Sequence, residues 1–370
     1  MTSILLVSNG YGEDVLAGYL AKECQLKGAR VMACPLVGEG DHYAKQGISI
    51  AFKNVVLPSG GFWRRLRDVI RDLFQGVIGQ MLKQRRKIKR LSANYQITIA
   101  VGDVFCLWMA AAGNRGKVVF IPTAKSDRFM AHSWIENWLI RRLSSQVFPR
   151  DTETESGMRD QNLPATFLGN LMWCGLSFSD VKPESSVLMI GILPGSREEA
   201  YANMAHILNV IVAMGPEAKK WEYCVARAPQ FNVSEMSEWL KVGDWDFAAG
   251  ADGTTIRHSA LGIRVQFSDD FQSVIQRSTF LIGLAGTANE QAVYCGRPVV
   301  AFPGTGPQTS LKRFEEQAHL LGNKLHVIPE TSAQKIGQSI LAMLDSLALE
   351  STFSPPQGNV AEVMATAILT

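Results

Sequence analysis

Short strand-like apolar runs alternate with helical patterns along the whole chain. This alternation is typical of parallel sheets whose strands are joined by crossover helices, with helices covering both faces of the sheet. We expect strands at residues 4–8, 30–34, 96–102, 117–121 and 146–148 in the first half, and at 187–193, 221–226, 262–266, 279–284 and 298–302 in the second. The sequence therefore predicts an α/β protein in which each half is doubly wound.

The length of the chain predicts two domains. A chain of 370 residues, 46% of them hydrophobic, exceeds what one ordinary core accommodates. Residues 169–186 contain Gly175, Pro183 and several serines, which indicates a hinge. We expect two Rossmann-like domains, 1–172 and 173–370, facing each other across a cleft. The second would include a helix near residues 331–349, and Pro355-Pro356 after it predicts a segment that runs over the surface.

The cysteines and the N-terminus favour a cytoplasmic protein. The six cysteines are scattered, without a C-x-x-C pair or the dense spacing of a disulfide scaffold. The first residues lack the basic start and long apolar stretch of a signal peptide, and no apolar run approaches the roughly 20 residues that cross a bilayer. The six histidines are dispersed, and no Walker-type loop, G-x-S-x-G elbow or H-E-x-x-H occurs. We expect neither a metal site nor a cofactor.

The first candidate site is the turn after the opening strand, which reads Ser8-Asn9-Gly10-Tyr11-Gly12-Glu13-Asp14. Its glycines begin a dinucleotide-type G-x-G-x-x-G, but Val15 occupies the third glycine position and no ribose-binding carboxylate follows the second strand. Glu13 and Asp14 would repel a pyrophosphate, whereas they can accept hydrogen bonds from sugar hydroxyls. The alternative is that both acids only cap the following helix.

The second candidate site is the turn Leu193-Pro194-Gly195-Ser196-Arg197-Glu198-Glu199, between an apolar strand and a helix. Ser196 and Glu199 have the spacing of a capping box, which explains both without a ligand. Arg197 has no such explanation, because a cation at a helix N-terminus is unfavourable unless an anion joins it. The turn therefore predicts a phosphate site.

The third candidate site repeats this pattern in Leu284-Ala285-Gly286-Thr287-Ala288-Asn289-Glu290. We expect Thr287 to cap the helix, with Glu290 either closing a capping box or binding a ribose. Two neighbouring strand ends that present backbone N–H groups at the carboxyl edge of a sheet form a suitable diphosphate site. Gly195, Ser196, Arg197, Gly286, Thr287 and Glu290 are therefore the candidate nucleotide-sugar ligands.

These turns resemble signature segments of the lipid-A-disaccharide synthase family, which are two-domain glycosyltransferases of the GT-B type. The run 193–197 followed by acids resembles the first signature, and Gly286-Thr287-Ala288 with Glu290 resembles the second. Residues 147–149 and 167–170 are similar to the family's segments just before its interdomain crossing. The resemblance implies a GT-B fold and an inverting transfer from a UDP-sugar.

The resemblance also implies that Asp103 is the catalytic base. Asp103 follows the apolar strand at its carboxyl end, where a carboxylate can take the proton of an attacking hydroxyl. The alternative is that Asp103 caps the next helix. The chain departs from the family at Asn170, where the family has a histidine, and in the segments 9–14 and 122–128. These departures concern the acceptor rather than the donor.

A basic amphipathic stretch extends from Phe62 to Arg90. It holds ten Lys or Arg against two Asp, a local balance of +8 in a chain whose net charge is +3. Apolar residues recur at helical spacing within it, so it can lie on an anionic membrane and present a lipid acceptor. The alternative is that its apolar face packs on the sheet. The candidate acceptor and membrane contacts are Phe62, Trp63, Arg64, Arg65, Arg67 and Arg71.

The sequence thus predicts a cytoplasmic, peripherally membrane-associated glycosyltransferase. It would move a sugar from a donor such as UDP-N-acetylglucosamine to a hydroxyl of a lipid-linked acceptor, with Asp103 as base and Glu13 and Asp14 facing sugar hydroxyls. No recognised nucleic-acid module accompanies the basic stretch, so no nucleic-acid partner is expected. Two alternatives remain: a UDP-sugar epimerase of the same architecture, and a non-catalytic paralogue that binds nucleotide-sugar or membrane.

Overall fold

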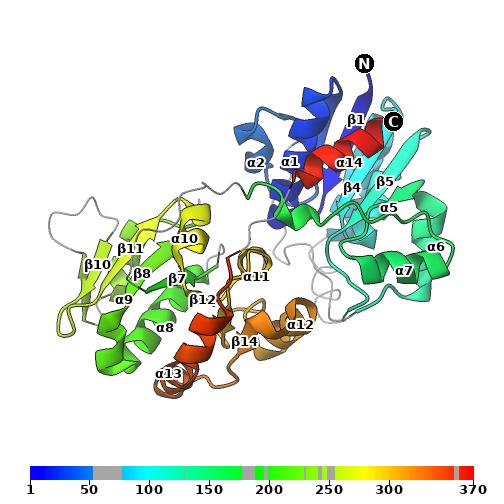
Figure 1. The fold of residues 1–370 in the computed structure, drawn as a ribbon. Coiled ribbons are helices and arrows are strands. Elements are labelled where there is room, and N and C mark those ends of the chain that lie inside the picture. Colours follow the sequence, from blue (N-terminus) through cyan, green and yellow to red (C-terminus); the bar gives the residue numbers. More distant parts are fainter. Residues whose placement is uncertain are drawn as a thin grey trace. The chain divides into compact units, whose positions relative to one another are not determined.

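The computed structural model describes residues 1–52, 77–128, 130–176, 188–195, 199–228, 231–240, 244–247, 255–353 and 358–370. The chain divides into two compact units. Unit 1 comprises residues 1–175 and 358–370, and unit 2 comprises residues 176–357. Each unit contains a sheet with helices packed on it (Figure 1). No described helix combines the length and apolarity needed to cross a membrane.

Unit 1 contains a parallel sheet. Its strands are β1 (Ser3–Ser8), β2 (Arg30–Pro35), β3 (Ser49–Ile50), β4 (Ile97–Gly102), β5 (Lys117–Pro122) and β6 (Gln146–Val147). They lie in the order β3-β2-β1-β4-β5-β6, with every pairing parallel. All residues of β1 and β4 are buried, because helices cover both faces of these central strands.

The helices of unit 1 form two layers. Among the described residues they are α1 (Tyr11–Leu26), α2 (Asp41–Lys45), α4 (Val77–Ser92), α5 (Val104–Ala110), α6 (Trp134–Leu143), α7 (Thr152–Asp160) and α14 (Val360–Leu369). Helix α5 contacts α4 and α6, whereas α1 contacts α2 and α14. Right-handed crossovers place the helices before and after β4 together on one face of the sheet.

Unit 2 contains a mixed sheet. Its strands are β7 (Met189–Leu193), β8 (Glu222–Ala226), β9 (Trp245–Phe247), β10 (Thr255–His258), β11 (Arg264–Ser268), β12 (Phe280–Gly283), β13 (Val299–Ala301) and β14 (Leu325–Val327). Their order is β14-β13-β12-β7-β8-β11-β10-β9. The helices are α8 (Ala200–Ala213), α9 (Ser237–Leu240), α10 (Phe271–Arg277), α11 (Thr287–Tyr294), α12 (Leu311–Leu321) and α13 (Ala333–Glu350). A continuous apolar core fills the space between sheet and helices.

The sequence pattern predicted the other strands of both units but missed four short ones, β3, β9, β10 and β14. The pattern is typical of parallel sheets, and the second sheet departs from it at one edge. Strand β10 pairs antiparallel with both β9 and β11. The segment between β10 and β11 is too short for a crossover, and Gly262 turns it with a φ of +70°.

The end of the chain also differs from the prediction. The second domain was expected to extend to residue 370, with the chain after Pro356 running over the surface. Instead, residues 358–370 belong to unit 1, where α14 lies against α1 (Figure 1). The apolar side chains Met364 and Ile368 are almost fully buried there. Burial of this face fixes the C-terminal helix on unit 1.

Candidate functional site

The carboxyl edge of the unit 1 sheet gathers polar side chains from three adjacent strands. Asn9 follows β1, Asp103 follows β4 and Thr123 follows β5. Parallel neighbouring strands end at the same edge, so residues distant in sequence become neighbours there. This edge is the candidate acceptor site of unit 1.

Asp103 combines the two roles that the sequence left open. It is the N-cap of α5, with Oδ1 accepting the Cys106 backbone N–H at 2.9 Å. The same oxygen accepts a hydrogen bond from Asn9 Nδ2 at 2.8 Å. Burial raises the pKa of Asp103 above its ordinary value, and the bonds from Cys106 and Asn9 partly offset this rise. Helix capping is therefore observed, while the catalytic role of Asp103 stays a prediction.

Gly102 allows Asn9 to approach Asp103 closely. Its φ of +148° lies outside the range that L-residues with side chains favour. A Cβ atom at this position would lie 3.0 Å from Cβ of Asn9 and 3.3 Å from Cβ of Cys106. A glycine before Asp103 thus brings the ends of β1 and β4 into contact.

Asp14 does not face the solvent as expected. Its side chain is only 2% exposed, and its Oδ1 accepts a hydrogen bond from Ser8 Oγ, which in turn accepts one from Tyr43. Burial raises the pKa of Asp14 to about 7, against the lowering effect of the Ser8 bond. This burial argues against the predicted contact of Asp14 with sugar hydroxyls, which stays a prediction. In the structure, Asp14 instead binds Ser8, the last residue of β1.

Glu13 lies at the edge itself. The Thr123 hydroxyl donates to Glu13 Oε1 at 3.3 Å, which connects the loops after β1 and β5. A Cβ atom on Gly10 would come within 2.5 Å of Glu13 Oε2, so the absence of a side chain at Gly10 leaves room for this carboxylate. Glu13 and Asp103 make the edge acidic, which suits a hydroxyl-bearing ligand better than a phosphate.

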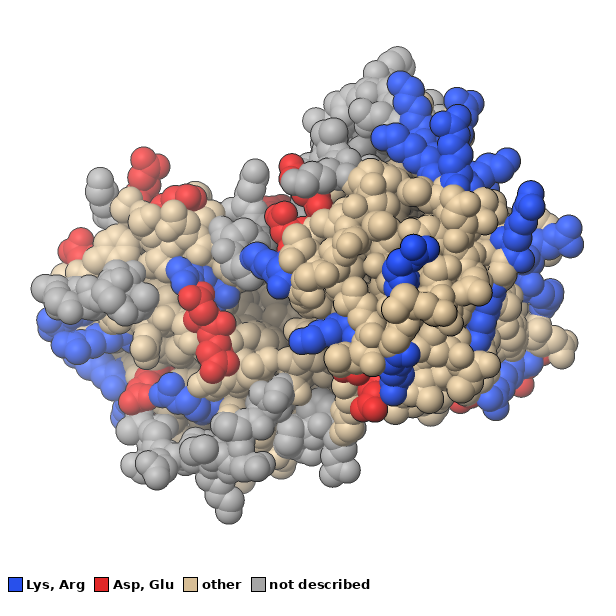
Figure 2. Space-filling view, turned by 90° about the horizontal axis from the view of Figure 1, so that it is seen from above, with Lys and Arg blue, Asp and Glu red and all other residues tan. Residues whose placement is uncertain are grey.

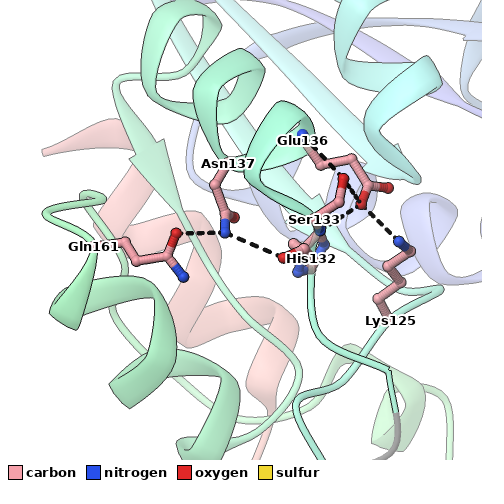
Figure 3. A network of polar contacts seen from close by, with 6 residues as sticks. All are labelled: Lys125, His132, Ser133, Glu136, Asn137 and Gln161. Carbon is pink, nitrogen blue, oxygen red and sulfur yellow. Dashed lines mark hydrogen bonds and ion pairs between the residues drawn. The ribbon is translucent and has the colours of Figure 1, made fainter.

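A second polar cluster joins α6 to the loop after β5 (Figure 3). Lys125 Nζ lies 2.6 Å from Glu136 Oε2, and that oxygen also accepts the Ser133 hydroxyl at 2.8 Å. Ser133 and Glu136 form a complete capping box. Burial lowers the pKa of the neighbouring His132 to about 4. Our sequence reading missed this cluster, although the spacing of Ser133 and Glu136 is a recognisable capping signal.

A small pocket in unit 1 unites the segments that resembled the family's crossing region. It is lined by residues 121–123, 148–150 and 169–172, together with Met364 of α14. Asn170, which stands where the family has a histidine, caps the short helix that follows by accepting the Met172 N–H. Asn170 therefore has a structural role in the fold of this segment.

In unit 2, the two glycine turns come from adjacent strands, as predicted. Strands β7 and β12 pair in parallel, and Leu284 N–H donates to Leu193 O at 2.8 Å. Gly195 has a φ of +106°, and a Cβ atom there would lie 3.3 Å from Leu284 O. The turn after β7 therefore needs glycine for conformation and for proximity to the turn after β12.

The capping of α11 differs from the expectation. The N-cap is Gly286 rather than Thr287, and no side chain caps the helix. Thr287 is the first residue of the helix, so its hydroxyl cannot act as the expected cap, and no capping box with Glu290 forms. Glu290 is half-buried in the first turn. The Gln317 amide, from α12, donates to Gly286 O at 2.8 Å and so helps to hold the turn after β12.

Asn203 organises the same edge and was missed by the sequence reading. Its buried amide accepts the Thr305 N–H at 2.7 Å and donates to Pro194 O at 3.4 Å. It thereby connects the turn after β7 to the loop after β13. A Cβ atom on Gly304 would come within 2.6 Å of Asn203 Oδ1. The run Gly304-Thr305-Gly306 was the sequence signal for this third loop.

Two groups of predicted residues lie outside the described residues. They are Ser196 and Arg197 of the turn after β7, and Phe62, Trp63, Arg64, Arg65, Arg67 and Arg71 of the basic stretch. Their roles stay predictions. Within the described parts of the chain, no three His, Cys, Asp or Glu side chains come together as a metal site requires.

Comparison with solved structures assigns the architecture. The chain aligns over its full length with the UDP-GlcNAc 2-epimerase of Neisseria meningitidis bound to UDP-GlcNAc, covering all of that chain at 11% identity and a TM-score of 0.59. It aligns equally with MurG of Acinetobacter baumannii, covering 99% of that chain at 12% identity and a TM-score of 0.58. The calicheamicin glycosyltransferase CalG4 gives 11% identity, a TM-score of 0.60 and coverage of 100% of this chain and 94% of that one.

The chain has the GT-B fold. This confirms the predicted fold class of two Rossmann-like units. The sequence matches no protein-family profile and no curated protein. At this level of identity the GT-B neighbours, which include both glycosyltransferases and epimerases, define the fold and leave the reaction to be argued from the site.

Proposed function

We propose that this protein is an inverting glycosyltransferase that moves a sugar from a UDP-sugar to a hydroxyl of a lipid-linked acceptor. The observation that carries the proposal is the Asp103 carboxylate, held by Asn9 and Cys106 at the carboxyl edge of β4 with a raised pKa. A half-buried carboxylate with a raised pKa is a stronger base than an ordinary one and stays within reach of substrate.

In the proposed reaction, the acceptor oxygen attacks the anomeric carbon of the donor sugar. A new glycosidic bond forms on the opposite side from the phosphate, the bond between the anomeric carbon and the phosphate oxygen breaks, and UDP leaves with its electron pair. Asp103 takes the proton of the acceptor hydroxyl. Asn9 and Cys106 both donate to Oδ1, which leaves Oδ2 for that proton.

Unit 2 would hold the nucleotide. The turns after β7 and β12 lie side by side, and the uncapped start of α11 at Gly286 offers backbone N–H groups to a diphosphate. In this proposal Ser196 and Arg197 bind the same diphosphate, while Glu290 binds the ribose. The neighbours that support a UDP donor are an epimerase bound to UDP-GlcNAc and the S. aureus MnaA structure with UDP.

In this proposal the acceptor binds to unit 1. Glu13 and Thr123 can accept and donate hydrogen bonds to sugar hydroxyls at the same edge as Asp103. A lipid-linked sugar acceptor, like that of the lipid-A-disaccharide synthase family, carries such hydroxyls. The basic stretch from Phe62 to Arg90 supports a cytoplasmic enzyme that contacts an anionic membrane surface where it meets this acceptor.

Asp103→Asn tests the proposal directly. Asparagine is a good N-cap, so α5 should keep its start while the base is lost. We expect at least ~100-fold loss of sugar transfer to lipid extracts, measured by mass spectrometry with several UDP-sugars, and unchanged UDP affinity by calorimetry. Asp270→Asn is the matched control, because Asp270 caps α10 through the same bond to the third helical residue. Equal turnover of the two variants would refute the assignment of Asp103.

A UDP-sugar epimerase is the second candidate, because an epimerase bound to UDP-GlcNAc is among the structural neighbours. An epimerase converts its nucleotide-sugar without an acceptor. Incubation with UDP-GlcNAc alone, followed by chromatography of the sugar, therefore separates the two activities. A protein that binds UDP but turns over neither substrate set would be the non-catalytic paralogue.

A further inference from the structure

Helix α6 exposes several large apolar side chains. Trp134 is 78% exposed, Trp138 is 55% exposed and Ile135 is 50% exposed. Met130, just before the helix, is exposed as well. We call these four residues the α6 tryptophan surface. Two exposed tryptophans one helical turn apart form a contiguous patch, and such apolar patches on a protein surface mark a binding surface.

The exposed side chains lie on a helix whose first turn is held by hydrogen bonds and an ion pair. The capping box of Ser133 and Glu136 fixes its first turn, and Lys125 anchors Glu136 to the loop after β5. The opposite side of the helix is buried through Asn137 and Ile140. Helix α6 packs on unit 1 through its buried side, so this packing does not require the two tryptophans. They are therefore accessible to a binding partner.

Helix α6 itself carries a net positive charge. Arg141 and Arg142 follow the tryptophans on the exposed side of α6. On the neighbouring helix α7, the carboxylates of Glu153 and Glu155 are paired with arginines. The acid of α6 itself, Glu136, is paired with Lys125. The charge that α6 adds to its surroundings is therefore positive.

The same face of the sheet carries further cations on α4. Helices α4, α5 and α6 pack in sequence, and α4 has no acidic residue. Its exposed cations are Lys83, Arg86, Lys87, Lys89 and Arg90. Figure 2 shows Lys and Arg side chains concentrated along the upper right margin, with few Asp or Glu among them. A second copy of this face would be repelled, whereas an anionic surface would be attracted.

We propose that the α6 tryptophan surface docks this protein on an anionic lipid bilayer. Tryptophan favours the boundary between headgroups and acyl chains, because its ring is apolar and its N–H can still be hydrated. Ile135 and Met130 enter the same boundary, while Arg141 and Arg142 contact lipid phosphates. This inference refines the lipid acceptor of the proposed function by naming the surface that meets the lipid.

The position of α6 fits this role. After a parallel strand, a crossover helix starts at the carboxyl edge of the sheet, so Trp134 at the start of α6 lies toward the same edge as Asp103. The Lys125–Glu136 pair connects α6 to the loop that begins with Thr123. A bilayer that contacts the first turns of α6 thus comes close to the edge where a lipid-linked hydroxyl would be deprotonated.

Vesicle flotation without any donor tests the docking surface separately from catalysis. The full-length protein is mixed with phosphatidylcholine vesicles, either pure or with about one-third phosphatidylglycerol. We expect binding to the anionic vesicles and at least tenfold weaker binding of the double variant Trp134→Gln, Trp138→Gln. The matched control is Trp239→Gln, an exposed tryptophan of α9 in unit 2, which should bind like the wild type. Arg141→Gln with Arg142→Gln should weaken binding to the anionic vesicles and reduce its salt dependence.

Three outcomes would overturn the proposal. The wild type does not float with anionic vesicles; the double tryptophan variant floats as well as the wild type; or the wild type is a dimer in solution that this variant dissociates. If a Phe62→Gln, Trp63→Gln variant alone loses binding, the second outcome applies and the basic stretch is the docking element. UDP affinity and unfolding temperature, measured on every variant, show that folding and the donor site are intact. If the wild type transfers no sugar to any lipid acceptor, the proposed function is refuted, and the vesicle result is unaffected.

Discussion

Asn9 and Asp103 lie 94 residues apart in sequence, and the Asn9 amide donates to Asp103 Oδ1 at 2.8 Å. The contact exists because β1 and β4 are adjacent parallel strands that end at the same edge. Asn9 Oδ1 is buried and has no hydrogen-bond partner in the described part of the chain, so the side chain is held through its Nδ2 bond to Asp103. We regard Asn9 as the positioning residue of the candidate base.

Asn9→Ala should change the pH dependence of sugar transfer more than its maximal rate. The Asn9 bond stabilises ionised Asp103 and lowers its pKa, so removal of the amide raises the pKa further. The acidic limb of kcat/KM should therefore move to higher pH. The profile is measured with the acceptor found in the lipid screen.

Asn114→Ala is the control for this variant. Asn114 donates to Thr98 Oγ1 at 2.6 Å in the same unit, but its interactions support the turn before β5. It should lower stability without moving the pH profile. A limb that stays in place in Asn9→Ala, or moves equally in both variants, would contradict the positioning role.

Asp14 should make unit 1 less stable as the pH rises. Its pKa is about 7 in the folded protein against an ordinary 3.8, so between these values the folded chain holds a proton that the unfolded chain has lost. Stability therefore falls across this window and levels off above it. Asp14→Asn removes the penalty and should stabilise the protein at pH 8 by up to about 4 kcal/mol, with little gain at pH 4.

Urea unfolding of wild type and Asp14→Asn across this pH range checks the sign. Ser8→Ala provides a second arm, because the Ser8 hydroxyl lowers the pKa of Asp14 and its loss should extend the fall in stability to higher pH. A constant difference between wild type and Asp14→Asn at all pH values would mean that burial does not perturb this carboxylate.

The sequence predicted the parts of the site that depend on chain order. Strand ends followed by glycine or acid are visible in the pattern, and they located Asp103, Gly195 and Gly286. Which side chains meet at these strand ends depends on the order of the strands in the sheet, and local periodicity does not contain that order. The hydrogen bonds of Asn9 with Asp103 and of Asn203 with Thr305 could therefore not be predicted. The same limit hid the burial of Asp14, because solvent-facing and core-facing positions of a first helical turn look alike in sequence.

The errors in the fold have a similar origin. Strands β3 and β10, of two and four residues, are too short to establish an alternating pattern. Helix α14 has a clear apolar face, but only the packing of Met364 and Ile368 against unit 1 determines which unit receives it. The residue that caps α11 could not be predicted either, because it depends on where the backbone enters the helix. The N-cap is Gly286 rather than Thr287.

Gly195→Ala should weaken UDP binding about tenfold. The backbone φ of +106° is strained for alanine, and the added methyl would crowd Leu284 O at 3.3 Å. The turn after β7 would then shift away from the turn after β12. Gly262→Ala is the control, since it also has a positive φ but lies in the β10–β11 turn, with no atom nearer than 3.8 Å to the added Cβ. Calorimetric UDP titrations of both variants distinguish a loss at the donor site from general backbone strain, because strain alone would affect the two alike.

Helix α14 should contribute to the stability of unit 1 and not to the donor site. Met364→Ala removes a side chain that is 1% exposed, which costs about 2–5 kcal/mol in typical cores. We expect a lower unfolding temperature and faster hydrogen exchange in α1, on which α14 packs, while UDP affinity stays unchanged because the candidate donor turns belong to unit 2. Val363→Ala on the same helix is the control, since Val363 is 50% exposed and should leave both quantities near the wild-type values. Equal destabilisation by the two variants would show that helix propensity, rather than packing on unit 1, determines the role of α14.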